Sequence, residues 1–311
     1  MLAIILPIFV LIAIGYALRR TGVIETETSY RIVGLIMNVT YPATLFLALA
    51  YTPFPAGVWK APLWSVVTLL GSGLVTLAYA RLTNMDNPTA GSLVFASAFG
   101  NTGYLGVPLA MMAYGETARI SAVVFDTFGV SMILYGFGFA ILAAFGGEVF
   151  SWKTVLAFFR TPTFLSAAAA LAVRAALPAW NAHFPEPWLV GKIVSQTLHL
   201  LMPLTFPLAA ISLGVNLRIR AVTEYFPQVV VAVIAKVMVM PLLAYGLIRL
   251  LGPGGVTGQA IVLEAAMPGG LVVGVLCGRF GCNARLGAAI TVGTTLATIV
   301  TLPFWTHLLG P

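Results

Sequence analysis

Charged residues are scarce in this sequence. Asp, Glu, Lys and Arg make up 8% of its 311 residues, whereas hydrophobic residues make up 60% and the mean hydropathy is +1.00. A soluble domain has about 25% charged and about 45–50% apolar residues, so this scarcity excludes a soluble fold of this size. The apolar runs extend over about 17–25 residues without alternation, as in bilayer-spanning helices. We therefore predict an all-α integral membrane protein.

Motifs for catalysis, metals and cofactors are also missing. The two cysteines, Cys277 and Cys282, form no CxxC pair, the three histidines are scattered, and no HExxH motif occurs. The glycine-rich segment 252–258 lacks the lysine of a phosphate-binding loop, so the chain has no motif for ATP-driven transport. We expect no metal, no cofactor and no enzymatic activity, and an intramembrane hydrolase is the weakest alternative.

Basic residues are present, but they lie near the ends of the apolar runs and form no basic stretch, which argues against nucleic-acid binding. Loops after odd-numbered spans hold ten of the sixteen Lys and Arg residues, and loops after even-numbered spans hold five. The positive-inside rule then places both termini outside the cytoplasmic (inner) membrane. The ten predicted spans are 2–18, 32–51, 62–80, 90–114, 118–145, 162–178, 190–215, 226–250, 257–281 and 285–308. A short interfacial helix is expected at 151–159.

An internal repeat divides the chain. Five spans per copy is an odd number, so the second copy would enter the membrane from the opposite side, an arrangement typical of secondary transporters. We expect one repeat at residues 1–150 and the other at 151–311. Three segment pairs match at an offset of 165 or 166: Leu35–Pro42 with Leu200–Pro207, Ala61-Pro62 with Phe226-Pro227, and Tyr114–Ala122 with Phe280–Ala288.

Glycine and proline interrupt the fourth and ninth predicted spans at corresponding places. Proline removes a donor, glycine permits unwinding, and the freed N–H groups at a helix break favour anions. Bare backbone at this depth requires a protein-lined or watery cavity, so we expect a substrate site where the two broken helices meet. Plain packing kinks are the alternative. The expected substrate-binding residues are Asn101, Thr102, Gly103, Pro268, Gly269 and Gly270.

Three ionisable residues fall deep inside spans, where they are costly and are functional candidates. Glu264 lies one helical turn before Pro268 and could carry a coupling proton, act as a gate or make a structural hydrogen bond. Lys236 could attract an anionic substrate or pair with a carboxylate, and Asp126 could be that carboxylate. Asn38 precedes a Thr-Tyr-Pro kink in the second span and is expected to cap it.

Four stretches together resemble the auxin efflux carrier family, the bacterial relatives of the plant PIN auxin carriers. They are Asn38–Pro42, Gly100–Pro108, Lys236–Pro241, and Ala265–Gly270 followed by Phe280-Gly281. The resemblance implies ten helices in two inverted halves, with a scaffold part and a mobile transport part. It also implies that broken helices four and nine cross at the substrate site, with Asn101, Pro108 and Pro268 at the crossover.

Family members move organic anions such as auxin, malate or malonate. Here Met-Pro-Gly-Gly stands where plant carriers tend to have a polar residue after the proline, which argues against auxin itself. We therefore expect a secondary transporter of small organic carboxylates that works by alternating access. The alternatives are a sodium-coupled symporter of the bile-acid type and a membrane ligand sensor. The expected partners are the organic anion and the lipid bilayer, and a homodimer is left open.

Overall fold

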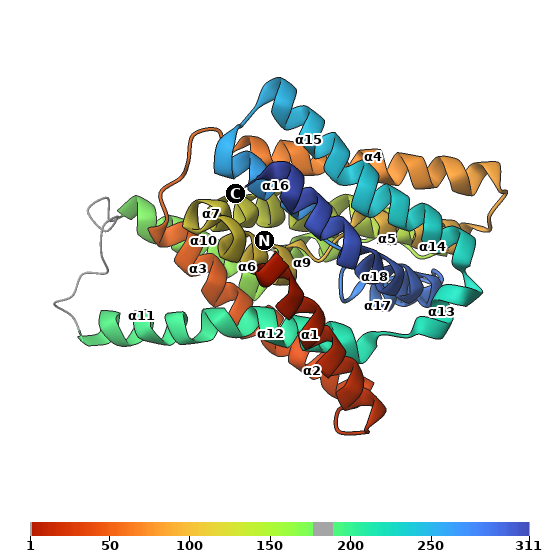
Figure 1. Ribbon diagram of the computed structural model, residues 1–311, viewed down its shortest axis with the longest axis horizontal. Helices are drawn as coiled ribbons and strands as arrows, with labels where there is room; N and C mark the ends of the chain where they lie inside the picture. The colour runs from red at the N-terminus through yellow and green to blue at the C-terminus, as the bar shows by residue number, and fades with distance from the viewer. Residues whose placement is uncertain (1, 177–188, 311) are drawn as a thin grey trace.

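The computed structural model describes residues 2–176 and 189–310, and throughout these residues the chain is helical, with one isolated β-bridge and no strand. Several long helices contain π-helical or 3-10 turns, so one span can carry two or three labels (Figure 1). The elements are α1 (Leu2–Arg20), α2 (Thr26–Leu35), η1 (Ile36–Thr40), α3 (Tyr41–Tyr51), α4 (Lys60–Leu82), α5 (Asn87–Ala98), η2 (Thr102–Gly106), α6 (Val107–Tyr114), α7 (Glu116–Phe125), η3 (Asp126–Ser131), η4 (Leu134–Gly138), α8 (Phe139–Gly146), α9 (Trp152–Phe158), α10 (Pro162–Ala176), α11 (Leu189–Leu201), η6 (Met202–Leu204), α12 (Thr205–Asn216), α13 (Ile219–Glu224), α14 (Phe226–Val233), η7 (Ile234–Val239), α15 (Met240–Leu251), α16 (Gly255–Ala265), α17 (Val273–Arg279) and α18 (Ala284–Leu309).

Within the described residues, seven helices are long and apolar enough to cross a membrane, and an eighth crossing results if α9 and α10, bent by 49°, are one span. A short helix is present at the position predicted, 151–159, as α9, whereas α13 was not expected. The predicted end of the sixth span, 177–178, lies outside the described residues. The other two predicted spans, the fourth and the ninth, are each interrupted, as α5 with α6 and α16 with α17. The chain is a multi-pass membrane protein.

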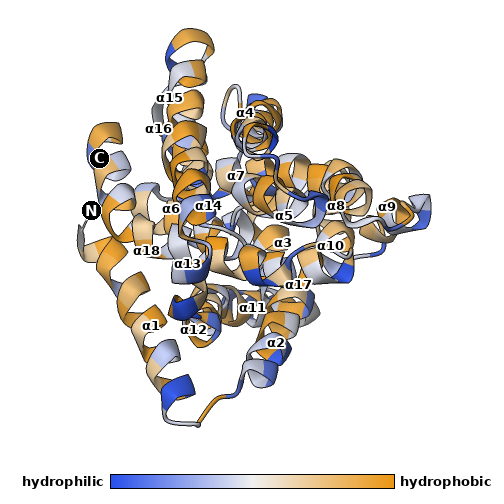
Figure 2. Cartoon of the chain, turned by 90° about the vertical axis from the view of Figure 1, so that its right-hand side faces the viewer, coloured by the Kyte–Doolittle hydropathy of each residue, from blue (hydrophilic) through white to orange (hydrophobic). Residues whose placement is uncertain are grey.

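Apolar side chains face outward as well as inward. On α1, Leu6, Val10 and Ile14 are spaced four residues apart and all exposed, and on α4 Leu74 is 64% exposed. Figure 2 shows hydrophobic colour along most of α1 and α15, with hydrophilic colour at the end of α1. An outer surface of this kind would be unfavourable in water, and it suits contact with lipid.

Caps fix where the helices around the breaks begin. The Asp86 carboxylate accepts a hydrogen bond from the backbone N–H of Thr89 at 3.1 Å, and Pro88 occupies the first turn of α5, where its missing N–H costs nothing. Asn283 caps α18 in the same manner by accepting from Leu286 N–H at 3.0 Å. The first cap sets the start of α5, which is the first half of the fourth span, and the second sets the start of α18, which packs against α5.

The interrupted spans are enclosed by the long helices. α5 packs against α4, α8 and α18, and α16 packs against α7 and α15. Figure 1 shows α11 and α12 following one another along one edge, with α1 beside α12. On the opposite edge α4 lies beside α15. The two helix interruptions are therefore held in the protein interior.

Candidate functional site

The breaks in the two interrupted spans contact each other through their backbones. Gly100 and Gly269 form an antiparallel β-bridge. Asn101 N–H donates to the Pro268 carbonyl at 2.7 Å, and Gly270 N–H donates to the Phe99 carbonyl at 3.2 Å. Backbone groups freed from both helices therefore satisfy one another at a depth where bare backbone would be costly.

Local sequence explains why the helices stop here. Phe99 adopts an extended conformation at the end of α5, and Pro268 has no N–H with which to continue α16. Hydroxyls of α18 bind the second break, since Gly269 N–H donates to Thr294 Oγ1 at 3.0 Å and Thr291 Oγ1 donates to the Gly270 carbonyl at 3.2 Å. The ninth span is thus opened by proline and glycine and held open by threonines.

Asn101 combines burial with an unused donor. Its side chain is 3% exposed, and its amide nitrogen has no hydrogen-bond partner. Its own backbone carbonyl accepts from the N–H groups of Leu105 and Gly106, which starts the π-helical turn η2. A buried polar group without a partner costs free energy, so this amide is available to a ligand that can accept a hydrogen bond.

A cavity of about 640 Å³ lies against the crossing. Asn101, Gly103 and Gly270 line it beside the breaks, and Asp126 lines it from η3. Its wall also includes aromatic side chains and two basic ones, from several different helices. These are Tyr41, Phe99, Tyr104, Tyr135, Phe139, Phe158, Lys153 and Arg279. A largely apolar cavity with a few convergent polar groups is the usual form of a small-molecule site.

Asp126 is buried and its carboxylate accepts hydrogen bonds from two hydroxyls, Tyr41 Oη and Thr102 Oγ1. These bonds join η3 to the kink of the second span and to the break of the fourth. Lys236 forms no ion pair with Asp126 within 4.0 Å, so the pairing that the sequence left open is not the arrangement in this structure. Asp126 instead holds Thr102 beside the cavity.

Lys236 and Glu264 lie behind the crossing and outside the cavity lining. The Lys236 ammonium donates to the carbonyl of Ala265, the last residue of α16, at 3.2 Å, where a positive charge offsets the negative end of the helix. Glu264 is fully buried, and neither of its carboxyl oxygens has a hydrogen-bond partner. Its carboxyl group packs on Gly106, so the two charged side chains contact the fourth span at different places.

Two expected site residues lie elsewhere. Pro108 occupies the first turn of α6, seven residues after Asn101, and it does not line the cavity. Asn38 is exposed, and its amide donates to the Gly34 carbonyl one turn earlier at 2.6 Å. It therefore binds its own helix at the π-helical turn η1, whereas the remaining expected substrate-binding residues cluster at the break.

Gly106 gives a direct test of the packing at the break. A Cβ atom there would lie 2.7 Å from Oε1 and Cδ of Glu264, closer than real contacts allow. We expect Gly106→Ala to destabilise the protein by about 1–3 kcal/mol, because the added methyl group displaces the buried carboxyl group. The matched control is Gly246→Ala, where a Cβ would meet nothing within 4 Å. Equal thermal midpoints for both variants would contradict this packing.

Several cavity residues were not expected from the sequence. Lys153 and Arg279 were counted only as topology signals, yet both line the cavity. Tyr41 stands directly before Pro42 in a motif that was noted, so that motif was the available signal for it. Lys153 and Arg279 could not be recognised because a basic residue at a helix end looks the same whether or not a cavity opens beside it.

Comparisons with known proteins identify the family of the chain. The model of the family described as "Membrane transport protein", which is the auxin efflux carrier family, matches residues 1–306. A protein of Methanothermobacter thermautotrophicus described as an uncharacterized transporter is 25% identical over 98% of this chain and 97% of its own length. A protein of Rhizobium meliloti named a "putative malonate transporter" is 26% identical over 96% of this chain and 92% of its own length.

Proposed function

Because the chain belongs to the membrane transport protein family, we propose that it is a secondary transporter of small organic carboxylates, with its substrate site at the crossing of the two interrupted spans. The observation that carries this proposal is the partnerless amide of Asn101 at the wall of the 640 Å³ cavity. A carboxylate can accept from this amide, and charge-assisted hydrogen bonds are about twice as strong as neutral ones.

The charges around the cavity favour an anion. Lys153 and Arg279 line it, and the third charged lining residue, Asp126, already accepts from Tyr41 and Thr102. The Rhizobium relative is named for malonate, a small dicarboxylate, which agrees with this substrate class. A dicarboxylate could contact the Asn101 amide with one end and a basic side chain with the other.

The proposed architecture has ten spans in two inverted repeats, residues 1–150 and 151–311, with the interrupted helices counted as the fourth and ninth spans. Packing supports a two-fold relation, because α1 packs on α12 while α10 packs on α3. The first contact joins the first and seventh spans. The second contact joins the sixth and second spans, which is the equivalent pair when the two halves are exchanged. Thr205 Oγ1 also donates to Thr40 Oγ1 at 3.0 Å, and these two residues are 165 apart, the offset of the sequence repeat. An axis between equivalent halves brings such residues together.

The proposed orientation places both termini outside the cytoplasmic membrane and opens the cavity toward the cytoplasm. Lys153 and Arg279, at the cavity wall, belong to the loops that the distribution of basic residues assigns to the cytoplasm. Alternating access then requires that the opposite side be closed in this conformation.

Arg119 supplies a contact on that opposite side. Its guanidinium pairs with Glu116, and it donates to Thr52 Oγ1 at 3.1 Å and to Met202 Sδ at 2.9 Å. The side chain is 6% exposed and joins α7 to the end of α3 and to η6. We propose that it holds the carrier closed toward the outside.

Arg119→Gln is expected to open that side. In a background lacking Cys277 and Cys282, a cysteine at buried Ser121 should react at least about tenfold faster with an impermeant maleimide, a change of about 1.4 kcal/mol. Arg31→Gln is the control, because Arg31 pairs with Glu27 at 3.0 Å on an exposed surface. An unchanged rate in Arg119→Gln would contradict the closing role.

The test of the function is ligand-dependent stability. Malonate, malate, acetate and a neutral diol should be added to the purified protein, with and without sodium, at two pH values. A true substrate at 100 times its dissociation constant should stabilise the protein by about 2.7 kcal/mol. Exchange of the same carboxylate across vesicles distinguishes a carrier from a sensor, and sodium dependence would indicate the bile-acid type of symporter. No shift with any carboxylate would reject the proposed substrate class.

A further inference from the structure

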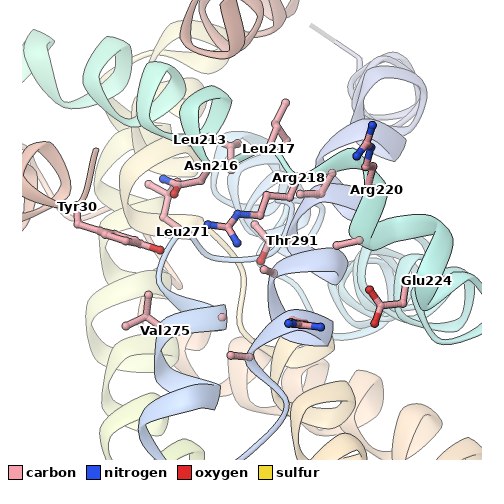
Figure 3. Close-up of a pocket in the computed structure, with 16 residues that line it drawn as sticks. Tyr30, Leu213, Asn216, Leu217, Arg218, Arg220, Glu224, Leu271, Val275 and Thr291 are labelled. Atoms are coloured by element: carbon pink, nitrogen blue, oxygen red, sulfur yellow. The ribbon is translucent and has the colours of Figure 1, made fainter. Parts of the chain in front are cut away.

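A second cleft, of about 490 Å³, lies between α2, α12, α13, α17 and α18. It is separate from the cavity at the crossing, although Leu271 and Val275 line both. The segment that carries these two residues therefore forms a wall between the two spaces. Figure 3 shows the Arg218 side chain reaching across the second cleft toward Asn216 and Leu271, with Arg220 and Glu224 on α13 at its far side.

Three arginines line this cleft, Arg218, Arg220 and Arg285. All three are exposed, and none of their side chains makes a hydrogen bond or ion pair within the described residues. Arg19, by contrast, donates to the carbonyls of Val215 and Leu217 at 3.2 and 3.0 Å. Glu224 is the one acidic residue in the lining, so three guanidinium groups face a single carboxylate.

The inner wall of the same cleft is apolar. It is lined by four buried side chains, Leu213, Leu217, Leu271 and Val292. The cleft therefore combines exposed basic side chains with buried apolar ones. The guanidinium fork binds phosphate oxygens in pairs, which suits a phosphate better than a lone ammonium would. Basic pockets between spans on the cytoplasmic side are a known form of anionic-lipid site, and these arginines lie in loops that the sequence places there.

We propose that this cleft binds an anionic phospholipid, with its phosphate held by Arg218, Arg220 and Arg285 and its apolar part against Leu217 and Leu271. A small soluble anion would use the arginines and leave the apolar wall uncovered, whereas a phospholipid uses both. Because Leu271 and Val275 also line the cavity at the crossing, a bound lipid would brace the wall of that cavity. Lipid binding itself does not depend on the proposed transport activity.

The test compares lipids on the full chain purified in a neutral detergent. Phosphatidylglycerol, phosphatidylcholine or sodium phosphate is titrated while the thermal midpoint is measured, and bound lipid is counted by native mass spectrometry. We expect phosphatidylglycerol alone to raise the midpoint. In the variant R218Q/R220Q/R285Q the half-saturating concentration of phosphatidylglycerol should rise at least about tenfold. The reason is that each basic residue near an anionic headgroup strengthens binding about fivefold.

The matched control is R20Q/R81Q/R160Q, which removes three exposed arginines from the same predicted side without touching the cleft. An equal rise in the half-saturating concentration of phosphatidylglycerol in both triple variants would overturn the site, because the effect would then be one of total charge. An equal midpoint shift with sodium phosphate would overturn the lipid and leave a free-anion site. No retained phosphatidylglycerol would overturn the proposal entirely. If the triple variant fails to fold, R220Q and R285Q are titrated singly, with the same outcomes.

Discussion

Asn101→Ala is expected to weaken substrate binding by about 10- to 150-fold while leaving the protein as stable as before. The amide nitrogen has no partner in the structure, so its removal takes no hydrogen bond from the fold and can even relieve a small cost. A bound carboxylate, however, would lose a charge-assisted hydrogen bond of about 1.5–3 kcal/mol, which weakens binding by about 10- to 150-fold. Stability and affinity should therefore separate in this one variant.

The measurement pairs a thermal midpoint without ligand with a carboxylate titration of the same sample. Asn87→Ala is the control, because Asn87 is an exposed residue at the start of the same interrupted span. A carboxylate affinity equal to that of the unmodified protein would place the substrate elsewhere. A large loss of stability would show that the amide serves the fold.

Glu264→Gln is expected to remove the pH dependence of transport. An ionised carboxylate that is fully buried without a donor is costly, so we expect this group to exchange a proton as the carrier changes conformation. The charged groups that interact electrostatically with the Glu264 carboxyl group are Asp126 on η3 and Lys236 on η7. Glutamine preserves the size of the side chain against Gly106 but cannot release a proton.

Initial rates of carboxylate uptake into vesicles, measured from pH 5 to pH 8, check this prediction. The profile should be flat in Glu264→Gln and unchanged in Glu148→Gln, which alters an exposed carboxylate. A preserved pH profile in Glu264→Gln would make Glu264 a structural residue. A flat profile in the unmodified protein would remove proton exchange from the mechanism.

The sequence predicted the helical membrane fold and both breaks because those features depend on local composition. Glycine and proline interrupt a helix wherever it packs, so 99–101 and 268–270 could be located without coordinates. The bridge between Gly100 and Gly269 could not, because it depends on how two distant helices approach each other. The resemblance to auxin efflux carriers supplied the expectation that they cross.

The partners of the buried charges also required the tertiary structure. Asp126 was a candidate partner for Lys236 because opposite charges in lipid are expected to pair. The structure gives Asp126 two hydroxyl donors, Tyr41 and Thr102, and gives Lys236 a helix-end carbonyl. Neutral donors and carbonyls are abundant in any sequence, so nothing in the chain marks which of them will lie beside a charge.

The bridge at the crossing is made by backbone atoms alone. Phe99 contributes its carbonyl and Asn101 its N–H, and neither contact depends on what their side chains are. Replacement of those side chains can therefore alter which solute is recognised without removing the hydrogen bonds that hold the two spans together. A lineage of carriers built on this crossing could diversify its cargo by point substitution and retain one architecture.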